Sequence, residues 1–261
     1  DKDGVNAWPN RAAQNVALIR KYKPDVIGFQ ELQAAHWESY VTQLPEYGRE
    51  CGPKVDNAEP FSYPAIFWNP DRLHLIRRGR LYLSKTPETF SSDWGSAYTR
   101  GATWVALQLN EFYEQPLLFL NTHLDNKSEA ARAGQADVLI RQAGLLRKPG
   151  QPVFVTGDFN CQPGSPPHTL FQGAGYKDAW TDAGGGEDAQ AGTFHNYTGQ
   201  PQEIWGRIDW ILYEPGKIAV KVLSCEVLRD GAPPVYPSDH FPVLATVALA
   251  PTPPAAPAGT R

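Results

Sequence analysis

Apolar residues recur at helical spacing in three long stretches of the chain. In the stretch 8–22, one face of the predicted helix carries Ala12, Val16, Ile19 and Tyr22. Pro24 ends this helix, because proline cannot continue the backbone hydrogen bonding. Two further helices are predicted over 34–44 and 128–147, and Ser128 is the expected N-cap of the last one.

Shorter apolar runs, separated by turn residues, predict roughly eight or nine strands. These runs are 25–31, 63–70, 74–83, 103–109, 116–124, 153–159, 207–213, 220–228 and 241–249. Many of them follow one another without an intervening helix. This mixture predicts an α/β (α+β) fold with two packed sheets flanked by helices, in preference to a doubly wound parallel sheet.

Length and composition favour one domain. The chain has 261 residues, of which 41% are hydrophobic and 20% charged, so the apolar material suffices for a sizeable core. No repeat of solenoid or propeller length is visible. Residues 250–261 are rich in Pro and Ala and are expected to form a flexible or extended tail after a domain over 1–249.

Charge and patterning restrict the function classes. The net charge of −4 argues against a broad basic surface for duplex nucleic acid. No apolar run is long enough for a membrane span and no signal peptide is recognised, so the sequence predicts a soluble monomer, either cytoplasmic or exported with its signal removed. The chain contains no Met and starts at Asp1, so we expect it to be a processed or truncated product.

Polar side chains stand at the ends of strands, or inside them, at five places. These are Gln30-Glu31, Asn121–Asp125, Asp158–Asn160, Arg207–Asp209 and Ser238–His240. Each has a simple structural explanation when taken alone: Glu31 is compatible with a helix cap, Asp158 with a turn, and His123 with a buried core position. Their common placement at strand ends favours one shared site.

Asp209 is the hardest of these residues to explain structurally. Its carboxylate stands in the apolar run "RIDWILY". Burying an unpaired carboxylate costs free energy on the order of several kcal/mol, so we expect a nearby His or Arg to pair with it. The set as a whole offers carboxylates for a hard divalent cation, amides and imidazoles for phosphate oxygens, and an Asp–His pair for proton transfer. Phosphoester hydrolysis requires these groups.

The order "QE", "NTHLD", "GDFN", "RIDW" and "SDHFPV" resembles the endonuclease/exonuclease/phosphatase superfamily, from about Asn6 to Leu249. That superfamily includes DNase-type nucleases, abasic-site endonucleases, inositol polyphosphate 5-phosphatases, neutral sphingomyelinases and deadenylases. The resemblance implies a four-layer αββα sandwich with two mostly antiparallel central sheets. Relatives also have a first strand that ends in a metal-binding Asn, and this chain starts after the equivalent position.

The resemblance also implies roles for individual residues. The residues that resemble catalytic groups are Asp158, Asn160, His240, Asp209 and His123. Arg100 and Asn121 resemble substrate-binding residues, while Glu31 and Asp239 resemble ligands of Mg²⁺ or Mn²⁺.

Among the catalytic group, Asp158 is expected to orient or deprotonate the attacking water, and Asn160 to contact the scissile phosphate. His240 is expected to neutralise the phosphate in the transition state, with Asp209 as its buried partner. His123 is expected to contact the phosphate.

Three functions follow from these features. The first is a Mg²⁺- or Mn²⁺-dependent phosphoesterase that acts on a phosphorylated small molecule or a lipid headgroup. The second is a nuclease acting on DNA or RNA, for which the eight Trp residues would permit base stacking although core packing explains most of them. The third is a catalytically silent binding or scaffold protein, which would have lost part of the acid, amide and imidazole set.

Overall fold

The structure is a computed structural model that describes residues 3–57, 61–110, 112–188 and 190–251. Its helices are η1 (Gly4–Asn6), α1 (Trp8–Tyr22), α2 (Ala34–Gln43), α3 (Glu129–Leu146), α4 (Pro166–Gly173) and α5 (Ala179–Asp182). Its strands are β1 (Val26–Gly28), β2 (Gly48–Glu50), β3 (Ile66–Trp68), β4 (Leu73–Tyr82), β5 (Gly101–Leu109), β6 (Phe112–His123), β7 (Val153–Asp158), β8 (Lys177–Asp178), β9 (Asp209–Glu214), β10 (Ile218–Val227) and β11 (Val243–Pro251). The three long helices predicted from periodicity are confirmed.

The largest sheet contains six strands in the order β4-β5-β6-β7-β9-β8. All neighbouring strands in it are antiparallel except β6 and β7, which run parallel. A parallel pair needs a long crossover, and α3 supplies it. The hydroxyl of Ser128 accepts a hydrogen bond from the backbone N–H of Ala131 at 3.1 Å and so caps α3 as predicted.

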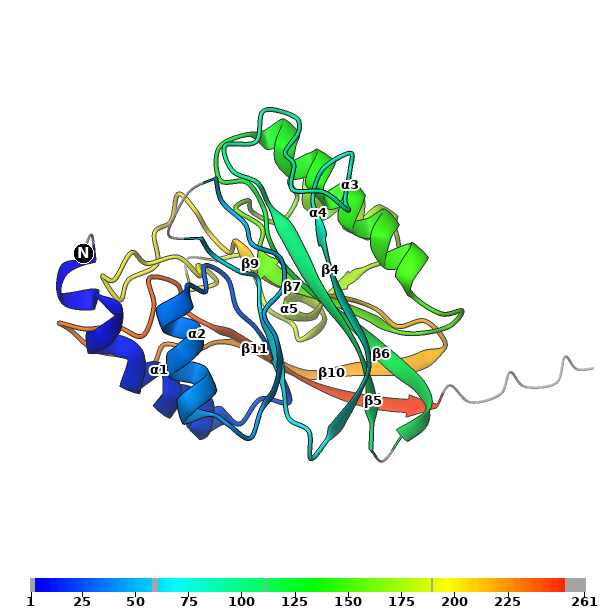
Figure 1. Ribbon diagram of the computed structural model, residues 1–261, viewed down its shortest axis with the longest axis horizontal. Coiled ribbons are helices and arrows are strands. Elements are labelled where there is room, and N and C mark those ends of the chain that lie inside the picture. Colours follow the sequence, from blue (N-terminus) through cyan, green and yellow to red (C-terminus); the bar gives the residue numbers. More distant parts are fainter. Residues whose placement is uncertain (1–2, 58–60, 111, 189, 252–261) are drawn as a thin grey trace, which may run out of the picture.

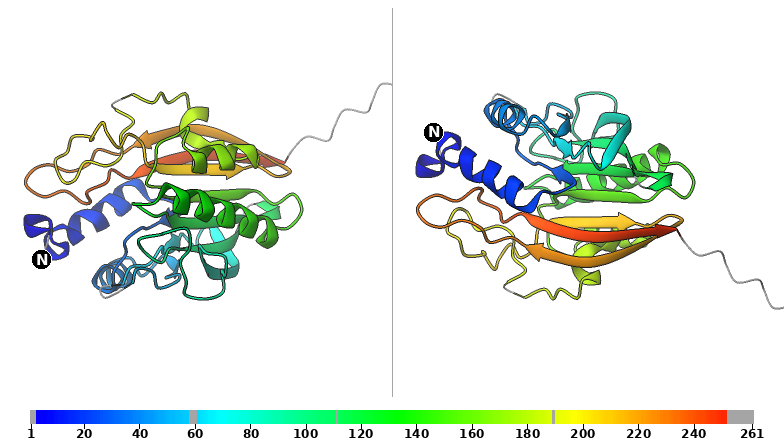
Figure 2. Two further views of the ribbon diagram at one scale, coloured as in Figure 1. Left: turned by 90° about the horizontal axis from the view of Figure 1, so that it is seen from above. Right: turned by 90° about the horizontal axis from the view of Figure 1, so that it is seen from below.

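The second central layer consists of two smaller antiparallel sheets, β1-β3-β2 and β10-β11. Within the described residues, no hydrogen-bonded ladder joins these two sheets. A core fills the space between the layers: Val105 and Phe154 of the large sheet belong to one buried cluster with Ile66, Val222 and Val247. Figure 2 shows β10 and β11, in orange and red, running side by side along the molecule.

Helices cover the outer face of each layer. Leu139 of α3 and Phe171 of α4 share a buried cluster with Val155 of the large sheet. On the other side, Val16 of α1 clusters with Phe67 of β3. The helices α1 and α2 therefore lie on the opposite side of the strands from α3 (Figure 1). This order of layers confirms the predicted αββα sandwich.

Two local predictions need correction. The run "CQPGSPP" predicts a loop, but α4 begins at Pro166, because proline is tolerated in the first turn of a helix where its missing N–H has no intrahelical acceptor. The predicted tail begins at residue 250, but β11 continues to Pro251, which pairs with Ile218. Residues 252–261 of that tail lie outside the described part of the chain.

Among the helices in the described part of the chain, none is both long enough and apolar enough to cross a bilayer.

A buried carboxylate anchors the loop between β4 and β5 to the start of α3. Asp125 is fully buried, and its two carboxylate oxygens accept hydrogen bonds from Ser96, Ala97, Tyr98, Lys127 and Ser128. Burial alone would raise the pKa of Asp125, but these hydrogen bonds outweigh burial and lower it. Asp125 therefore stabilises the fold in its ionised form.

We expect Asp125→Asn to lower the free energy of unfolding by about 2 kcal/mol at neutral pH, because an amide nitrogen would then face N–H donors. The stabilisation from a carboxylate with a lowered pKa is present above its unfolded pKa and is lost as the pH falls through its folded pKa. The difference between the variant and the wild type should therefore shrink in acid. Urea unfolding across acidic and neutral pH measures it, with the exposed Asp71→Asn as control; equal losses for both variants would contradict the prediction.

Candidate active site

Three predicted site residues lie in one row across neighbouring strands of the large sheet. His123 at the end of β6 is paired in register with Asp158 at the end of β7. Asp158 is in turn paired in register with Asp209, the first residue of β9. Because β6 and β7 are parallel and β9 runs back from the same edge, three strands deliver their polar side chains to one place.

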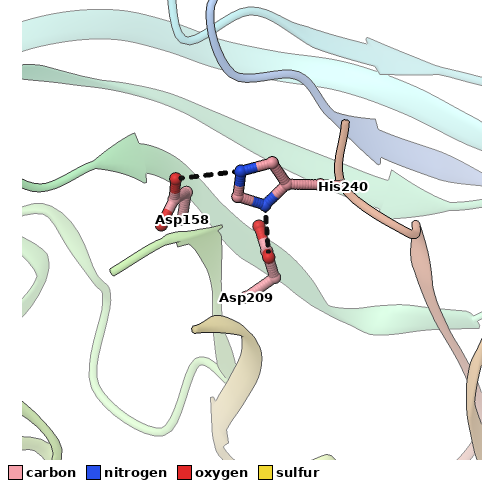
Figure 3. A group of neighbouring side chains, drawn as sticks. All are labelled: Asp158, Asp209 and His240. Atoms are coloured by element: carbon pink, nitrogen blue, oxygen red, sulfur yellow. Dashed lines mark hydrogen bonds and ion pairs between the residues drawn. The ribbon is translucent and has the colours of Figure 1, made fainter. Parts of the chain in front are cut away.

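The imidazole of His240 joins this row from the loop before β11. Its Nδ1 lies 2.8 Å from Oδ2 of Asp209, and its Nε2 lies 3.9 Å from Oδ2 of Asp158. Figure 3 shows the ring between the two carboxylates. The ligand-type atoms of all three side chains lie within 4.8 Å of one another. The apolar setting of Asp209 predicts a His or Arg partner, and His240 is that partner in the structure.

Burial and mutual charge shift the pKa values of this group. Burial lowers the pKa of His240, but the charge of Asp209 and its hydrogen bond outweigh burial and raise the pKa well above its ordinary value. Burial raises the pKa of Asp158, and the neighbouring charge of Asp209 raises it further. The imidazole is therefore held cationic, and the Asp158 carboxylate is more basic than an ordinary aspartate.

Asn160 and His123 contact each other beside Asp158. The amide nitrogen Nδ2 of Asn160 donates to the carbonyl of Leu124 at 2.9 Å and lies 2.9 Å from Nε2 of His123. Since Nδ2 can donate, Nε2 is the acceptor in this pair, and the proton of the ring is then on Nδ1. Both amide hydrogens of Asn160 are engaged within the protein in this structure, and its carboxamide orients His123. Its contact with the scissile phosphate stays a prediction.

His123 is buried and carries an unused donor. Burial lowers the pKa of His123, and the positive charges of Arg100 and His240 lower it further, so the ring is neutral. Its Nδ1 has no hydrogen-bond partner within the described residues. The backbone N–H of Asn160 donates to Oδ1 of Asp158 at 2.8 Å, with Asn160 in the left-handed conformation that asparagine tolerates.

Glu31 and Asp239 approach the site from the other central layer and from the loop that carries His240. Glu31 follows β1 and has a φ of 52°, a strained conformation for glutamate. The residue is exposed by surface area, but surrounding atoms desolvate its carboxylate, which raises its pKa, and the charge of Asp239 raises the pKa further. Two carboxylates that repel each other in this way fit a hard divalent cation, which takes oxygen ligands. These two residues could hold such a metal ion.

Arg100 immediately precedes β5, with 3% of its surface exposed. Its Nη1 is 3.8 Å from Oδ1 of Asp56, and its Nε has no hydrogen-bond partner within the described residues. It is near enough to affect the pKa values of both Glu31 and His123. Asp56, which orients it, was missed by sequence reasoning, since a carboxylate in the turn "VDN" has the pattern of any surface turn.

Asn121 is fully buried, and its side chain is hydrogen-bonded within the protein. Its amide nitrogen donates to the carbonyls of Phe29 at 2.7 Å and Ala65 at 3.1 Å, and its Oδ1 accepts from Gln30 and Thr156. In the structure Asn121 thus ties the two central layers together, and its predicted substrate contact stays a prediction. A Cβ at Gly28 would collide with Asn121, so glycine is needed there for the layers to approach closely.

The start of α1 fixes the loop that leads to His240. Arg11 and Asn15 both donate to the carbonyl of Pro237, at 3.0 Å and 2.6 Å. The backbone N–H of Tyr236 donates to Oδ1 of the buried Asn6 at 3.0 Å. These residues, separated from the loop by more than 200 positions, give no local sequence signal of the contact.

Comparison with known proteins agrees with this geometry. The Endonuclease/Exonuclease/phosphatase family matches residues 2–240. The mannosyl-6-phosphatase of Bacteroides thetaiotaomicron has 26% sequence identity and a TM-score of 0.83, and the match covers 95% of this chain and 94% of that one. The human Nocturnin catalytic domain, solved with a bound sulfate anion, has 21% identity and a TM-score of 0.72 over 95% of this chain and 89% of its own. At that identity the Nocturnin likeness shows the fold alone.

Curated relatives are longer than this chain. The Carbon catabolite repressor protein 4 homolog 1 of Arabidopsis thaliana is 25% identical over an alignment of 195 residues, and the match covers 63% of this chain and 32% of the relative. This chain thus matches about a third of that protein. The family match over nearly the whole chain, the αββα layers and the row of Asp and His side chains at one sheet edge lead to one conclusion: the chain belongs to the endonuclease/exonuclease/phosphatase family, whose members hydrolyse phosphoester bonds.

Proposed function

We propose that this protein is a divalent-metal-dependent phosphoesterase that hydrolyses a P–O bond by in-line attack of water. The observation that carries the proposal is the Asp209–His240–Asp158 arrangement, with a cationic imidazole between two carboxylates at the edge of the sheet. A cationic donor beside a basic carboxylate suits a reaction in which water must lose a proton while negative charge develops on phosphate oxygens.

Glu31 and Asp239 would hold Mg²⁺ or Mn²⁺ in this proposal. When bound, the metal ion supplies Lewis-acid neutralisation of the phosphate charge. Both ions accept carboxylate oxygens together with substrate oxygens, so a site with two protein carboxylates is adequate.

Side chains of the protein carry out the remaining steps of the reaction. Asp158 accepts a proton from the attacking water, whose oxygen forms the new bond to phosphorus. The bond from phosphorus to the leaving oxygen breaks, and that oxygen takes up a proton from solvent, so that the products are an alcohol and a phosphate. His240 stabilises the charge on the phosphate oxygens, and Nδ1 of His123 and Nε of Arg100 are the unused donors available to them.

Nuclease activity is the second candidate. It is supported by the ring of Trp205, which is 39% exposed and packs against Phe194, itself in contact with His240. Exposed aromatic rings stack on nucleic-acid bases. A silent scaffold is disfavoured, because the acid, amide and imidazole set is present at the sheet edge.

The test is hydrolysis of a panel with Mg²⁺, with Mn²⁺ or with EDTA. The panel contains bis-p-nitrophenyl phosphate, p-nitrophenyl phosphate, single- and double-stranded DNA, RNA, inositol phosphates and sphingomyelin. We expect activity with either metal ion and at least about a hundredfold less with EDTA, restored by excess Mg²⁺. Activity that is indifferent to EDTA would contradict the metal requirement, and hydrolysis of no substrate would favour the scaffold.

A further inference from the structure

Asp209 and His240 stand on two separate segments of the chain. Asp209 opens β9, whereas His240 lies in the loop before β11, and their side chains meet at 2.8 Å. Within the described residues, no backbone hydrogen bond runs directly between 206–210 and 236–242. Backbone hydrogen bonds that fix these two segments relative to each other must therefore come through a third part of the chain.

Thr193 binds the segment that carries Asp209. The residue is fully buried, and its hydroxyl oxygen accepts hydrogen bonds from the backbone N–H groups of Ile208 at 3.1 Å and Asp209 at 3.2 Å. The neighbouring strand β8 pairs with β9 at Leu212 and Tyr213 and does not reach the start of β9. The two lone pairs of one hydroxyl oxygen therefore satisfy two backbone donors that this strand neighbour leaves without an acceptor.

The same residue binds the loop that carries His240. The backbone carbonyl of Thr193 accepts a hydrogen bond from the N–H of Phe241 at 2.7 Å. The next residue, Phe194, forms an isolated β-bridge with His240, and the centroids of their rings are 5.0 Å apart. Thr193 thus contacts β9 through its side chain and the His240 loop through its backbone.

The pairing with the loop continues at His195. The backbone N–H of His195 donates to the carbonyl of Asp239 at 2.8 Å. Its ring stacks on that of Phe241, with centroids 3.9 Å apart and an interplanar angle of 20°. His195 is buried, so these contacts lie in the interior of the protein. One short segment that begins at Thr193 therefore holds the loop on both sides of His240.

We propose that Thr193 is a positioning residue, which keeps the carboxylate of Asp209 and the imidazole of His240 at hydrogen-bonding distance. Its own side chain is too deeply buried to touch a substrate. Groups at a catalytic site must stay within about 0.5 Å of their productive geometry, so a buried hydrogen bond beside the pair affects the rate. The inference rests on the proposed function, in which this pair stabilises the charge on the phosphate oxygens.

A purely structural role for the Thr193 hydroxyl predicts different behaviour. A hydroxyl that only stabilised the fold would lower the free energy of unfolding without selecting one kinetic constant. A positioning hydroxyl affects kcat and leaves KM nearly unchanged, because the pair acts as charge develops in the transition state. Its effect also requires Asp209, since a group that acts through a carboxylate has little to position once that carboxylate is removed.

The test is Thr193→Val, which keeps the branched shape of the side chain and removes the acceptor. We expect kcat for p-nitrophenyl phosphate or bis-p-nitrophenyl phosphate at saturating Mg²⁺ to fall by about tenfold, with KM within about twofold. Thr193→Ser keeps the hydroxyl and should retain kcat within about twofold. Hydrogen exchange at the backbone N–H groups of Ile208 and Asp209 should accelerate in Thr193→Val and not in Thr193→Ser, and it reports the lost hydrogen bonds without turnover.

The matched control is Thr103→Val, the same substitution at another fully buried threonine. The hydroxyl of Thr103 has no hydrogen-bond partner within the described residues, so kcat and KM should stay unchanged. In the Asp209→Asn background, Thr193→Val should lower kcat by less than about twofold. If Thr193→Val does not fold, Thr193→Ser and Thr193→Ala replace it in the same cycle, because these two variants differ by the hydroxyl alone.

Several results would overturn the positioning role. They are an unchanged kcat on removal of the Thr193 hydroxyl, a loss confined to KM, an equal loss of kcat with and without the Asp209 carboxylate, or unchanged exchange at Ile208 and Asp209. Each of them leaves hydrolysis by the wild type, and so the proposed function, intact. A wild type that hydrolyses neither ester nor any other substrate of the panel would overturn the proposed function and the inference with it.

Discussion

Asp158→Asn is expected to lower kcat for phosphoester hydrolysis by about a hundredfold or more. Burial and the charge of Asp209 raise the pKa of Asp158, so its carboxylate is well suited to take a proton from water. Asparagine keeps the shape of the side chain and can still accept the hydrogen bond from the backbone of Asn160, but it cannot accept that proton. The measurement is kcat with p-nitrophenyl phosphate and bis-p-nitrophenyl phosphate at saturating Mg²⁺.

The same substitution should not weaken the fold. A carboxylate whose folded pKa is raised above its unfolded value destabilises the protein at any pH above that unfolded value. The neutral amide of Asp158→Asn removes this cost and also the repulsion from Asp209, so the free energy of unfolding at neutral pH should stay equal or rise. A loss of activity with retained stability separates catalysis from misfolding.

The control is Asp137→Asn, on the exposed face of α3, where the carboxylate only pairs with Arg141. It should leave kcat unchanged, because an exposed ion pair contributes little. If Asp158→Asn retained the activity of this control, the role proposed for Asp158 as the proton acceptor would be wrong.

The row of site residues was predictable because its members stand at the ends of predicted strands. His123, Asp158 and Asp209 each interrupt an apolar run, and the parallel pairing of β6 and β7 brings two of them to one edge. That Asp209 needs a partner, either His or Arg, was predictable on energetic grounds, since a carboxylate in an apolar run is costly without one. The structure supplies His240 as that partner.

The sequence could not predict which polar side chains are hydrogen-bonded within the protein and which remain available to a substrate. Asn121 and Asn160 both follow apolar runs, yet all donors of both side chains are consumed within the protein. Equally, Asp56 orients Arg100 from a turn that has no periodic pattern. Such roles depend on which segments meet in space, and neither composition nor spacing reports those contacts.

The helices and strands also differ in how well the sequence predicts them. The long helices have many periodic positions and were predicted closely, whereas α4 and β8 are short and stand in stretches rich in Pro and Gly. Arg207 and Asp178 hold that region through a buried ion pair at 2.7 Å between residues 29 positions apart. Local propensity carries little information where a long-range contact decides the structure.

Asp209→Asn is expected to lower kcat by about a hundredfold at alkaline pH and by less in mild acid. In the wild type, burial lowers the pKa of His240, but the charge and hydrogen bond of Asp209 outweigh it and keep the ring cationic. Without the carboxylate, the pKa of His240 falls, so the ring loses its proton at a lower pH than before. Activity that depends on the cation should then decline from that lower pH upward.

The full pH dependence of kcat distinguishes this role from a merely structural one. In Asp209→Asn the basic limb of the profile should move to lower pH, because deprotonation of His240 now occurs earlier. His240→Ala should lose about a hundredfold at every pH and lack this limb, since no imidazole remains to titrate. If Asp209→Asn instead lowered kcat by one factor at all pH values, the carboxylate would not act by holding the proton on His240, and its contribution would be confined to positioning the ring.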